Sequence, residues 1–80
     1  MEGHTDNVAI SPALRKQFPT NWELSTARAT NVVRFLQDSV GIPPAQLQAV
    51  GLSEYHPVAS NGTMRGRGQN RRIEIGLLPE

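Results

Sequence analysis

Polar side chains with potential binding chemistry follow one another near the N-terminus, in the run Gly3-His4-Thr5-Asp6-Asn7. This run suits the end of a strand that enters a loop, and loops of this kind commonly carry binding sites on a rigid support. A capping Asp6 in an Asx turn is the plainer interpretation of the same residues. Both interpretations place the Asp6 carboxylate just beyond a strand.

A second charged group with potential chemistry is Arg28, on a predicted helix with one buried face. Beside Leu24 and Phe35 at the rim of that face, the guanidinium of Arg28 must stay hydrated or paired. It could extend to solvent or turn into a cleft. Across a cleft from Asp6, Arg28 would bind a carboxylate while Asp6 accepts from an ammonium. Such a pair suits a zwitterionic ligand such as an amino acid.

The histidines predict neither a metal site nor an enzyme. His4 could ligate a metal, but the only other histidine is His56, and the sequence contains no HExxH pattern or carboxylate cluster. A hydrolase built from Ser25, His4 and Asp6 is the catalytic alternative. The sequence lacks a GxSxG turn, however, and His4 and Asp6 are too close in sequence to specify a triad. We expect no catalytic residue, no metal and no cofactor.

Four arginines lie within residues 65–72, among glycines that resemble an RGG-type segment. No aromatic residue interleaves them, so a solvated loop or a local anion clamp is favoured over nucleic-acid binding. Binding of an anionic polymer through Arg65 to Arg72 stays open as an alternative function.

Eighty residues allow one small domain with a thin hydrophobic core. Eight basic and seven acidic side chains give a formal net charge of +1, which excludes a globally basic nucleic-acid binder. The lack of cysteine excludes disulfide scaffolds, thiolate zinc sites and cysteine nucleophiles. No apolar stretch approaches the ~20 residues of a membrane span, and no leader pattern opens the chain. Any anchor of the parent protein is expected outside this chain.

A helix that begins at an N-cap Asn21 and stops at Gly41 and Pro43 is the clearest predicted element. At 100° per residue, its buried stripe is expected to contain seven residues: Trp22, Ser25, Ala29, Val32, Val33, Leu36 and Val40. Before it, residues 7–21 predict a loop with one helical turn after Pro12.

Three strands are predicted around the helix: one ending at residues 2–4, one over residues 47–52, and one over residues 71–77 with Ile73, Ile75 and Leu77 on one face. A turn is expected at residues 53–57, and residues 59–70 form a loop that could hold one turn of helix. These elements predict an α+β fold with the helix packed on a small sheet.

Three motifs in this order resemble the OmpA-like peptidoglycan-binding domain: Glu2-Gly3-His4-Thr5-Asp6, then Asn21-Trp22-Glu23-Leu24-Ser25 with Ala27-Arg28-Ala29, then Asn70-Arg71-Arg72-Ile73-Glu74-Ile75. Within that family the chain is most similar to the MotB branch of flagellar stator proteins. The resemblance implies an α/β sandwich in which helices pack on one small mixed sheet, in the order βαβαββ. It also implies that residues 1–80 are the C-terminal two-thirds of a domain whose first strand and helix are missing.

The resemblance implies non-catalytic binding of the peptide stem of peptidoglycan, with Asp6 accepting from the ammonium of diaminopimelate and Arg28 holding a carboxylate. By their positions in the matching motifs, four further residues would line the site: Thr5, Asn7, Asn21 and Leu24. Arg72 would supply a secondary charge near the end of the strand. His4 would support the end of the strand. The partner would be peptidoglycan and not nucleic acid.

The expected location is the periplasm, in a parent protein anchored in the inner or outer membrane through segments outside this chain and assembled as a homodimer or larger complex. A stator, a porin and a lipoprotein all remain possible parents. The chain departs from the family pattern after Gly51, where Leu52 and Ser53 replace an aromatic residue and a glycine. It departs again at Met64, Arg65 and Gly68, so the short helix there is expected to fray.

Overall fold

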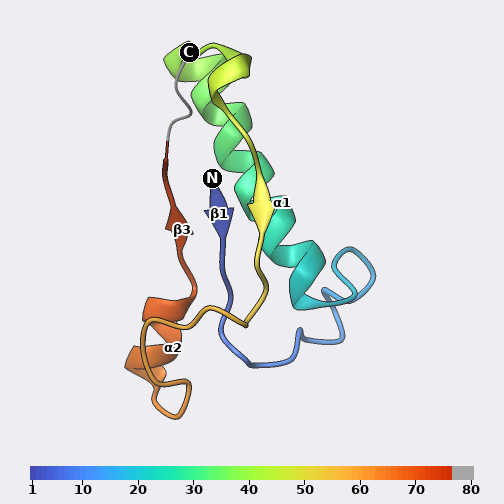
Figure 1. The fold of residues 1–80 in the computed structure, drawn as a ribbon. Helices are drawn as coiled ribbons and strands as arrows, with labels where there is room; N and C mark the ends of the chain where they lie inside the picture. Colours follow the sequence, from blue (N-terminus) through green and yellow to red (C-terminus); the bar gives the residue numbers. More distant parts are fainter. Residues whose placement is uncertain (77–80) are drawn as a thin grey trace.

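The computed structural model describes residues 1–76 as a small mixed sheet with two α-helices, which confirms the predicted α+β class. Figure 1 shows the arrangement of these elements. In chain order they are β1 Glu2–Gly3, α1 Asn21–Phe35, the π-helical turn η1 Leu36–Val40, the 3-10 turn η2 Pro44–Gln46, β2 Val50–Gly51, α2 Met64–Asn70 and β3 Ile73–Glu74.

The sheet has β1 in the middle, parallel to β2 on one side and antiparallel to β3 on the other. Backbone hydrogen bonds extend this pairing beyond the strands, from Leu52 N to Gly3 O at 3.0 Å and from His4 N to Arg72 O at 2.9 Å. The outer strands are shorter than the predicted spans 47–52 and 71–77, because only two residues of each pair with β1. Leu77, predicted to share one face with Ile73 and Ile75, falls outside the described residues.

Two glycines let α1 pack directly on the sheet. A Cβ atom on Gly3 would lie 2.0 Å from the backbone oxygen of Ser25, and one on Gly51 would lie 2.0 Å from Thr26 Oγ1. Gly3 and Gly51 are also register partners across β1 and β2. The helix backbone therefore approaches the sheet where neither strand carries a side chain, which holds the start of α1 next to the end of β1.

The N-cap of α1 is Thr20 and not the predicted Asn21. Thr20 Oγ1 accepts a hydrogen bond from Trp22 N at 3.2 Å, and Glu23 Oε2 accepts one from Thr20 N at 3.0 Å, which completes a capping box. The Thr20 hydroxyl also donates to the Glu23 carboxylate, and this hydrogen bond holds the pKa of Glu23 below its ordinary value. The predicted stop is confirmed, because Gly41 follows η1 with a left-handed φ of 85°.

Only part of the predicted apolar stripe is buried. Ser25 and Ala29 are buried, whereas Trp22 is 47% and Val40 57% exposed. The physical reason is a mismatch of lengths, because a two-residue strand spans about 7 Å and a 15-residue helix about 22 Å. The sheet therefore covers a fraction of α1 and leaves both ends of the stripe more open.

The two connections around the sheet contain short hydrogen-bonded structure. In the first loop, Arg15 N donates to Ser11 O at 3.2 Å and Phe18 N donates to Leu14 O at 2.9 Å, which confirms a helical turn after Pro12. The segment predicted as a loop over residues 59–70 contains α2, which has seven residues and is capped by Thr63. Within residues 1–76, no helix is long and apolar enough to cross a membrane.

Candidate functional site

Asp6 lies just beyond β1, as predicted, and its carboxylate is held from two sides. Oδ1 accepts from Val8 N at 3.0 Å, which is the Asx-type bond that the sequence suggested. Oδ2 accepts from Arg71 Nη1 at 2.6 Å. The Asp6 side chain is 8% and that of Arg71 48% exposed, so this ion pair is buried on the carboxylate side and open to solvent on the guanidinium side. The Asx turn expected at Asp6 is therefore present, and the same carboxylate also pairs with Arg71.

A chain of hydrogen bonds from α1 fixes the backbone that leads to Asp6. The buried Ser25 hydroxyl accepts from Ser53 N at 3.1 Å, and Ser53 O accepts from Thr5 N at 2.9 Å. Ser53 has a φ of 53°, a left-handed conformation that glycine adopts more readily. This finding explains why a glycine suits the position after Leu52, where the family pattern has one.

The first two turns of α1 supply the other wall of the site. Asn21, Leu24 and Arg28 fall within about 60° of one another at 100° per residue, so they share one helical face. Asn21 Nδ2 donates to Asp6 O at 3.3 Å and to Val8 O at 3.4 Å, which ties the helix start to the loop after β1. Arg28 is exposed and has no hydrogen bond or ion pair with any residue in 1–76. Its guanidinium is therefore available to a ligand.

These groups line one pocket of about 150 Å³. It contains five of the seven residues that the sequence predicted for the site, namely Thr5, Asp6, Asn21, Leu24 and Arg28. It adds Arg71 and a largely apolar wall formed by Val8, Ala9, Ile10, Ser11 and Leu14. At about 30 Å³ per water molecule, the volume suits a small polar end group and not a whole oligopeptide. One carboxylate and two guanidiniums meet at this pocket, so it can bind both charges of a zwitterion.

Two predicted site residues lie elsewhere. Asn7 is exposed and does not line the pocket. Arg72 faces an adjoining pocket of about 390 Å³, which it lines with Arg28, Arg71 and Ile73. Its Nε donates to Glu74 Oε2 at 2.9 Å, and this hydrogen bond holds the pKa of Glu74 below its ordinary value.

Arg71 is the residue that sequence reasoning missed. It sits at the C-cap of α2, directly after the buried Asn70, and its side chain reaches back to Asp6. The available signal was the pair Arg71-Arg72, but a sequence does not tell which of two neighbours turns toward the pocket. The backbone pairing makes this choice. Arg72 O accepts from His4 N, so Arg72 lies beside β1 and its side chain bonds to Glu74. Arg71 is then the neighbour that reaches Asp6.

The hydrolase arrangement is not assembled among the described residues. The Ser25 hydroxyl donates to Trp22 O at 3.1 Å and is buried under the sheet. Gly3 faces α1, and side chains alternate along a strand, so His4 points to the opposite face of the sheet from Ser25. His4 instead approaches Glu2 and Glu74, which are the described residues that could hold a metal with it.

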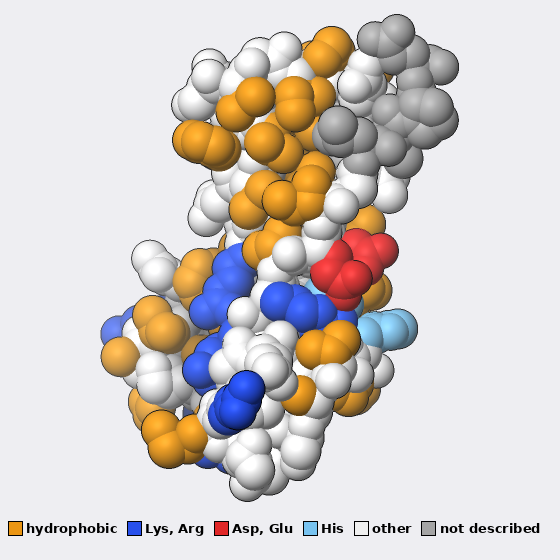
Figure 2. Space-filling view, turned by 90° about the vertical axis from the view of Figure 1, so that its left-hand side faces the viewer, with side chains coloured by type: hydrophobic (Ala, Val, Ile, Leu, Met, Phe, Trp, Pro, Cys, Tyr) orange, Lys and Arg blue, Asp and Glu red, His pale blue; other side chains and the backbone are white. Residues whose placement is uncertain are grey.

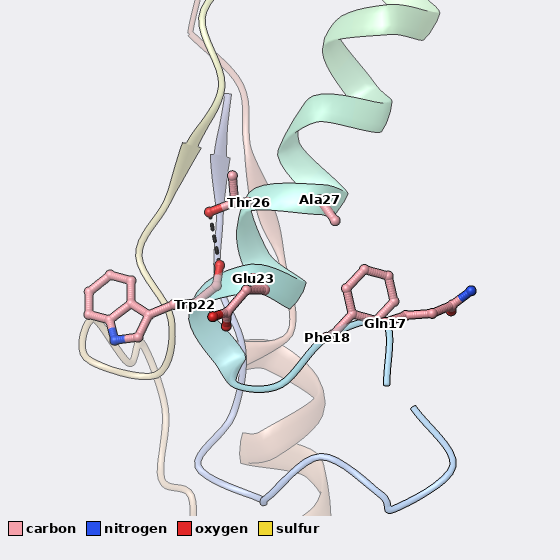
Figure 3. A pocket seen from close by; sticks show the side chains of 6 residues that line it. All are labelled: Gln17, Phe18, Trp22, Glu23, Thr26 and Ala27. Carbon is pink, nitrogen blue, oxygen red and sulfur yellow. Dashed lines mark hydrogen bonds between the residues drawn. The ribbon is translucent and has the colours of Figure 1, made fainter. Parts of the chain in front are cut away.

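A third pocket, of about 440 Å³, lies on another side of α1 and is drawn in Figure 3. Gln17 and Phe18 flank the helix on one side and Trp22 on the other, with Thr26 donating to Trp22 O at 2.8 Å. Its one charged group is Glu23, which is already engaged in the capping box. This pocket therefore offers a polar ligand no free charge, whereas the pocket at Asp6 offers the unpaired guanidinium of Arg28.

Residues 1–71 match the model of the OmpA family. The chain belongs to the OmpA family. This finding confirms the family resemblance of the three sequence motifs, and the mixed sheet with its helices confirms the implied fold. The pocket at Asp6 is thus a feature of an OmpA-family chain.

The proteins similar to this OmpA-family chain include members of the MotB branch. Motility protein B of Bacillus subtilis (strain 168) is 42% identical over 79 residues, which are 99% of this chain and 29% of that protein. A protein described as MotB-like from Desulfovibrio vulgaris has a crystal structure that matches 88% of this chain and 41% of its own, with a TM-score of 0.77 and 41% identity.

A second solved structure is described as the cell wall anchor of the T6SS from Pseudomonas aeruginosa. It matches 86% of this chain and 46% of its own length, with a TM-score of 0.74 and 39% identity. The chain therefore spans less than half the length of each of these three proteins.

Proposed function

We propose that this chain binds the peptide stem of peptidoglycan without cleaving it, and so anchors a membrane-associated assembly to the cell wall. The observation that carries the proposal is the pocket in which the Asp6 carboxylate meets the guanidiniums of Arg28 and Arg71. The description of one solved neighbour as a cell wall anchor supports the same role. The periplasm is the compartment where such an anchor would work.

The ligand group that fits this pocket best is the free end of diaminopimelate, which carries an ammonium and a carboxylate on one carbon. Asp6 would accept from the ammonium, and the unpaired Arg28 would take the carboxylate. Arg71 already pairs with Asp6, so it would hold the carboxylate group of Asp6 in place and share the ligand's negative charge. Lysine at the same stem position offers the ammonium without the carboxylate, so it should bind less tightly.

A second candidate function is supported by the adjoining pocket of Arg28, Arg71 and Arg72, which could clamp an anionic polymer. The two functions differ in their response to salt, because binding to a chain of phosphates weakens steeply as salt rises. A shielded contact with one zwitterionic group weakens less.

The test is a quantitative pull-down on purified sacculi. Asp6→Asn and Arg28→Ala should each lower the affinity about ten- to a hundredfold, because a charge-assisted hydrogen bond contributes roughly 1.5–3 kcal/mol. Arg65→Ala is the matched control, because Arg65 is an exposed arginine of α2 outside both pockets. Circular dichroism of each variant verifies the fold.

Sacculi with diaminopimelate should bind the chain more tightly than sacculi with lysine, and no soluble fragments should appear over time. Equal binding by the parent chain, Asp6→Asn and Arg28→Ala would contradict the site. Equal losses in Arg28→Ala and Arg72→Ala, together with a steep salt dependence, would favour the anionic polymer, because Arg72 lines the adjoining pocket and not the pocket at Asp6.

A further inference from the structure

A separate group of potential ligands lies on the face of the sheet that points away from α1. Glu2 and His4 both project there, because Gly3 between them faces the helix. Glu74 of β3 is the antiparallel register partner of Glu2 and joins them. One ligand atom from each residue lies within 4.8 Å of the other two. Figure 2 shows acidic and histidine side chains next to each other on the side of the molecule it presents.

His4 is the unusual member of this group, because its ring is buried without a hydrogen bond. The residue is 2% exposed, and neither Nδ1 nor Nε2 has a hydrogen-bond partner within residues 1–76. Nε2 nevertheless points at both carboxylates, 3.5 Å from Glu2 Oε1 and 3.3 Å from Glu74 Oε2. These distances are within the range of an ion pair but are long for a hydrogen bond. A buried nitrogen in this position calls for a further partner.

The spacing of these atoms suits one zinc-like ion. Zinc binds histidine nitrogen and carboxylate oxygen at about 2.0–2.2 Å, so two ligands of one tetrahedral ion lie about 3.4 Å apart. Both distances from His4 Nε2, 3.5 Å and 3.3 Å, are close to that value. The side chains of Glu2 and Glu74 are 51% and 53% exposed, so each can adjust toward an ion.

The charges of the group also favour a cation. Glu2 and Glu74 face each other directly across β1 and β3, and like charges in that position repel. Arg72 pairs with Glu74 through Oε2, the same oxygen that lies 3.3 Å from His4 Nε2, and this pairing offsets one of the two negative charges. The half-exposed Glu74 carboxylate can turn its other oxygen toward an ion. The two carboxylates and the one guanidinium together leave one negative charge beside the His4 ring.

We propose that Glu2, His4 and Glu74 bind one divalent transition-metal cation with the ligand preference of zinc, and that the cation ties β1 to β3. One imidazole nitrogen with two carboxylate oxygens suits zinc better than magnesium or calcium, which prefer all-oxygen sites. Sequence spacing does not reveal this site, because only strand pairing brings Glu74 to His4. This proposal departs from the sequence analysis, which predicted no metal site.

The test uses the 80-residue chain without a histidine tag, treated with a chelator and then titrated with zinc chloride in a calorimeter above neutral pH. About one zinc ion per chain should bind. Glu2→Gln and Glu74→Gln should each weaken binding about tenfold or more, and both should fold because these side chains are half exposed. The matched control is Glu54→Gln, a carboxylate outside the group, which should bind zinc like the parent chain. Magnesium should produce no binding in the same range.

His4→Gln should also abolish the visible absorption that cobalt acquires in a tetrahedral site. A chain that binds no zinc contradicts the proposal, and so does an unchanged affinity in both glutamine variants. Loss of binding in His56→Ala with full binding in His4→Gln would also overturn it, because the exposed ring of His56, 6.1 Å from that of His4, would then hold the ion. None of these outcomes depends on binding to sacculi, so this proposal and the proposed function can fail independently.

Discussion

Asp6 owes its position to neighbours that hold it from several directions. Its carboxylate accepts from Val8 N and from Arg71, and its backbone oxygen accepts from Asn21. Arg28, which faces the same pocket, has no such partner within the described residues. The pocket therefore combines one fixed anion with one free cation, an arrangement suited to a ligand that carries both charges.

At the same scale, Asn70 supports the arginine that reaches Asp6. The Asn70 amide is buried and makes four hydrogen bonds: from Val58 N at 2.8 Å and Ala59 N at 3.0 Å, and to Ala59 O at 3.0 Å and Asn61 Oδ1 at 2.7 Å. Asn70→Ala leaves buried backbone groups without partners and should lower the free energy of unfolding by about 1–3 kcal/mol. Urea unfolding measures this change.

Gln69→Ala is the control for that substitution, because Gln69 is an exposed neighbour in the same helix. Its effect should stay within about 0.5 kcal/mol. An Asn70→Ala chain that unfolds at the same urea concentration as Gln69→Ala would show that the amide network does not stabilise this corner of the fold.

Among the elements, α1 depends on the capping box at its start. Thr20→Ala removes the side-chain oxygen that accepts from Trp22 N and should destabilise the fold by about 1 kcal/mol. In a domain of this size, that loss lowers the melting temperature by about 4–8 °C. The same box also predicts a pH effect, because the hydrogen bond from the Thr20 hydroxyl lowers the pKa of Glu23 in the folded chain.

A lowered folded-state pKa means that Glu23 stabilises the fold above its unfolded pKa, and that this contribution disappears as the pH falls through the folded value. The difference in melting temperature between the parent chain and Glu23→Gln should therefore be largest near neutral pH and shrink in acid. Asp38→Asn, an exposed carboxylate at the other end of the helix, is the control. A difference that stays constant from neutral to acid pH would contradict the role of the ionised Glu23.

The same elements show what could be predicted from the sequence. The helix stop at Gly41 and the Asp6 and Arg28 pocket were predictable, because a glycine C-cap and charged residues in a family motif are local signals. The N-cap was displaced by one residue, because Thr20 and Asn21 are both good caps and only the geometry selects between them. A local pattern does not contain the pairing between distant segments. That pairing sets the lengths of the strands and decides that Arg71, and not Arg72, reaches Asp6.

At the scale of the whole molecule, the buried interior is small and largely polar. Among the described residues, the buried hydrophobic ones are Met1, Ile10 and Ala29, whereas six buried residues are polar or charged. Figure 2 shows hydrophobic side chains gathered on the upper half of the side it presents. Exposed apolar surface of this kind, next to sheet edges only two residues long, favours association with another copy or with further chain.

We therefore expect the 80-residue chain to be marginally stable and to associate with itself as its concentration rises. Phe35, 60% exposed at the end of α1, should contribute to this association, so Phe35→Gln should reduce the apparent mass in sedimentation or light scattering. Met64→Gln is the control, because Met64 is 81% exposed but belongs to α2, at the far end of the molecule from η1 in Figure 1.

A longer chain that begins with the strand and helix implied upstream by the family resemblance should be monodisperse and melt at a higher temperature. The added elements would bury apolar surface that is now exposed, at about 25 cal/mol per Å², and would pair with a free sheet edge. Each net kcal/mol gained should raise the melting temperature by about 4–8 °C. An 80-residue chain that stays monomeric at high concentration and melts as cooperatively and as high as the longer one would contradict this account, because its exposed apolar face would then need no cover.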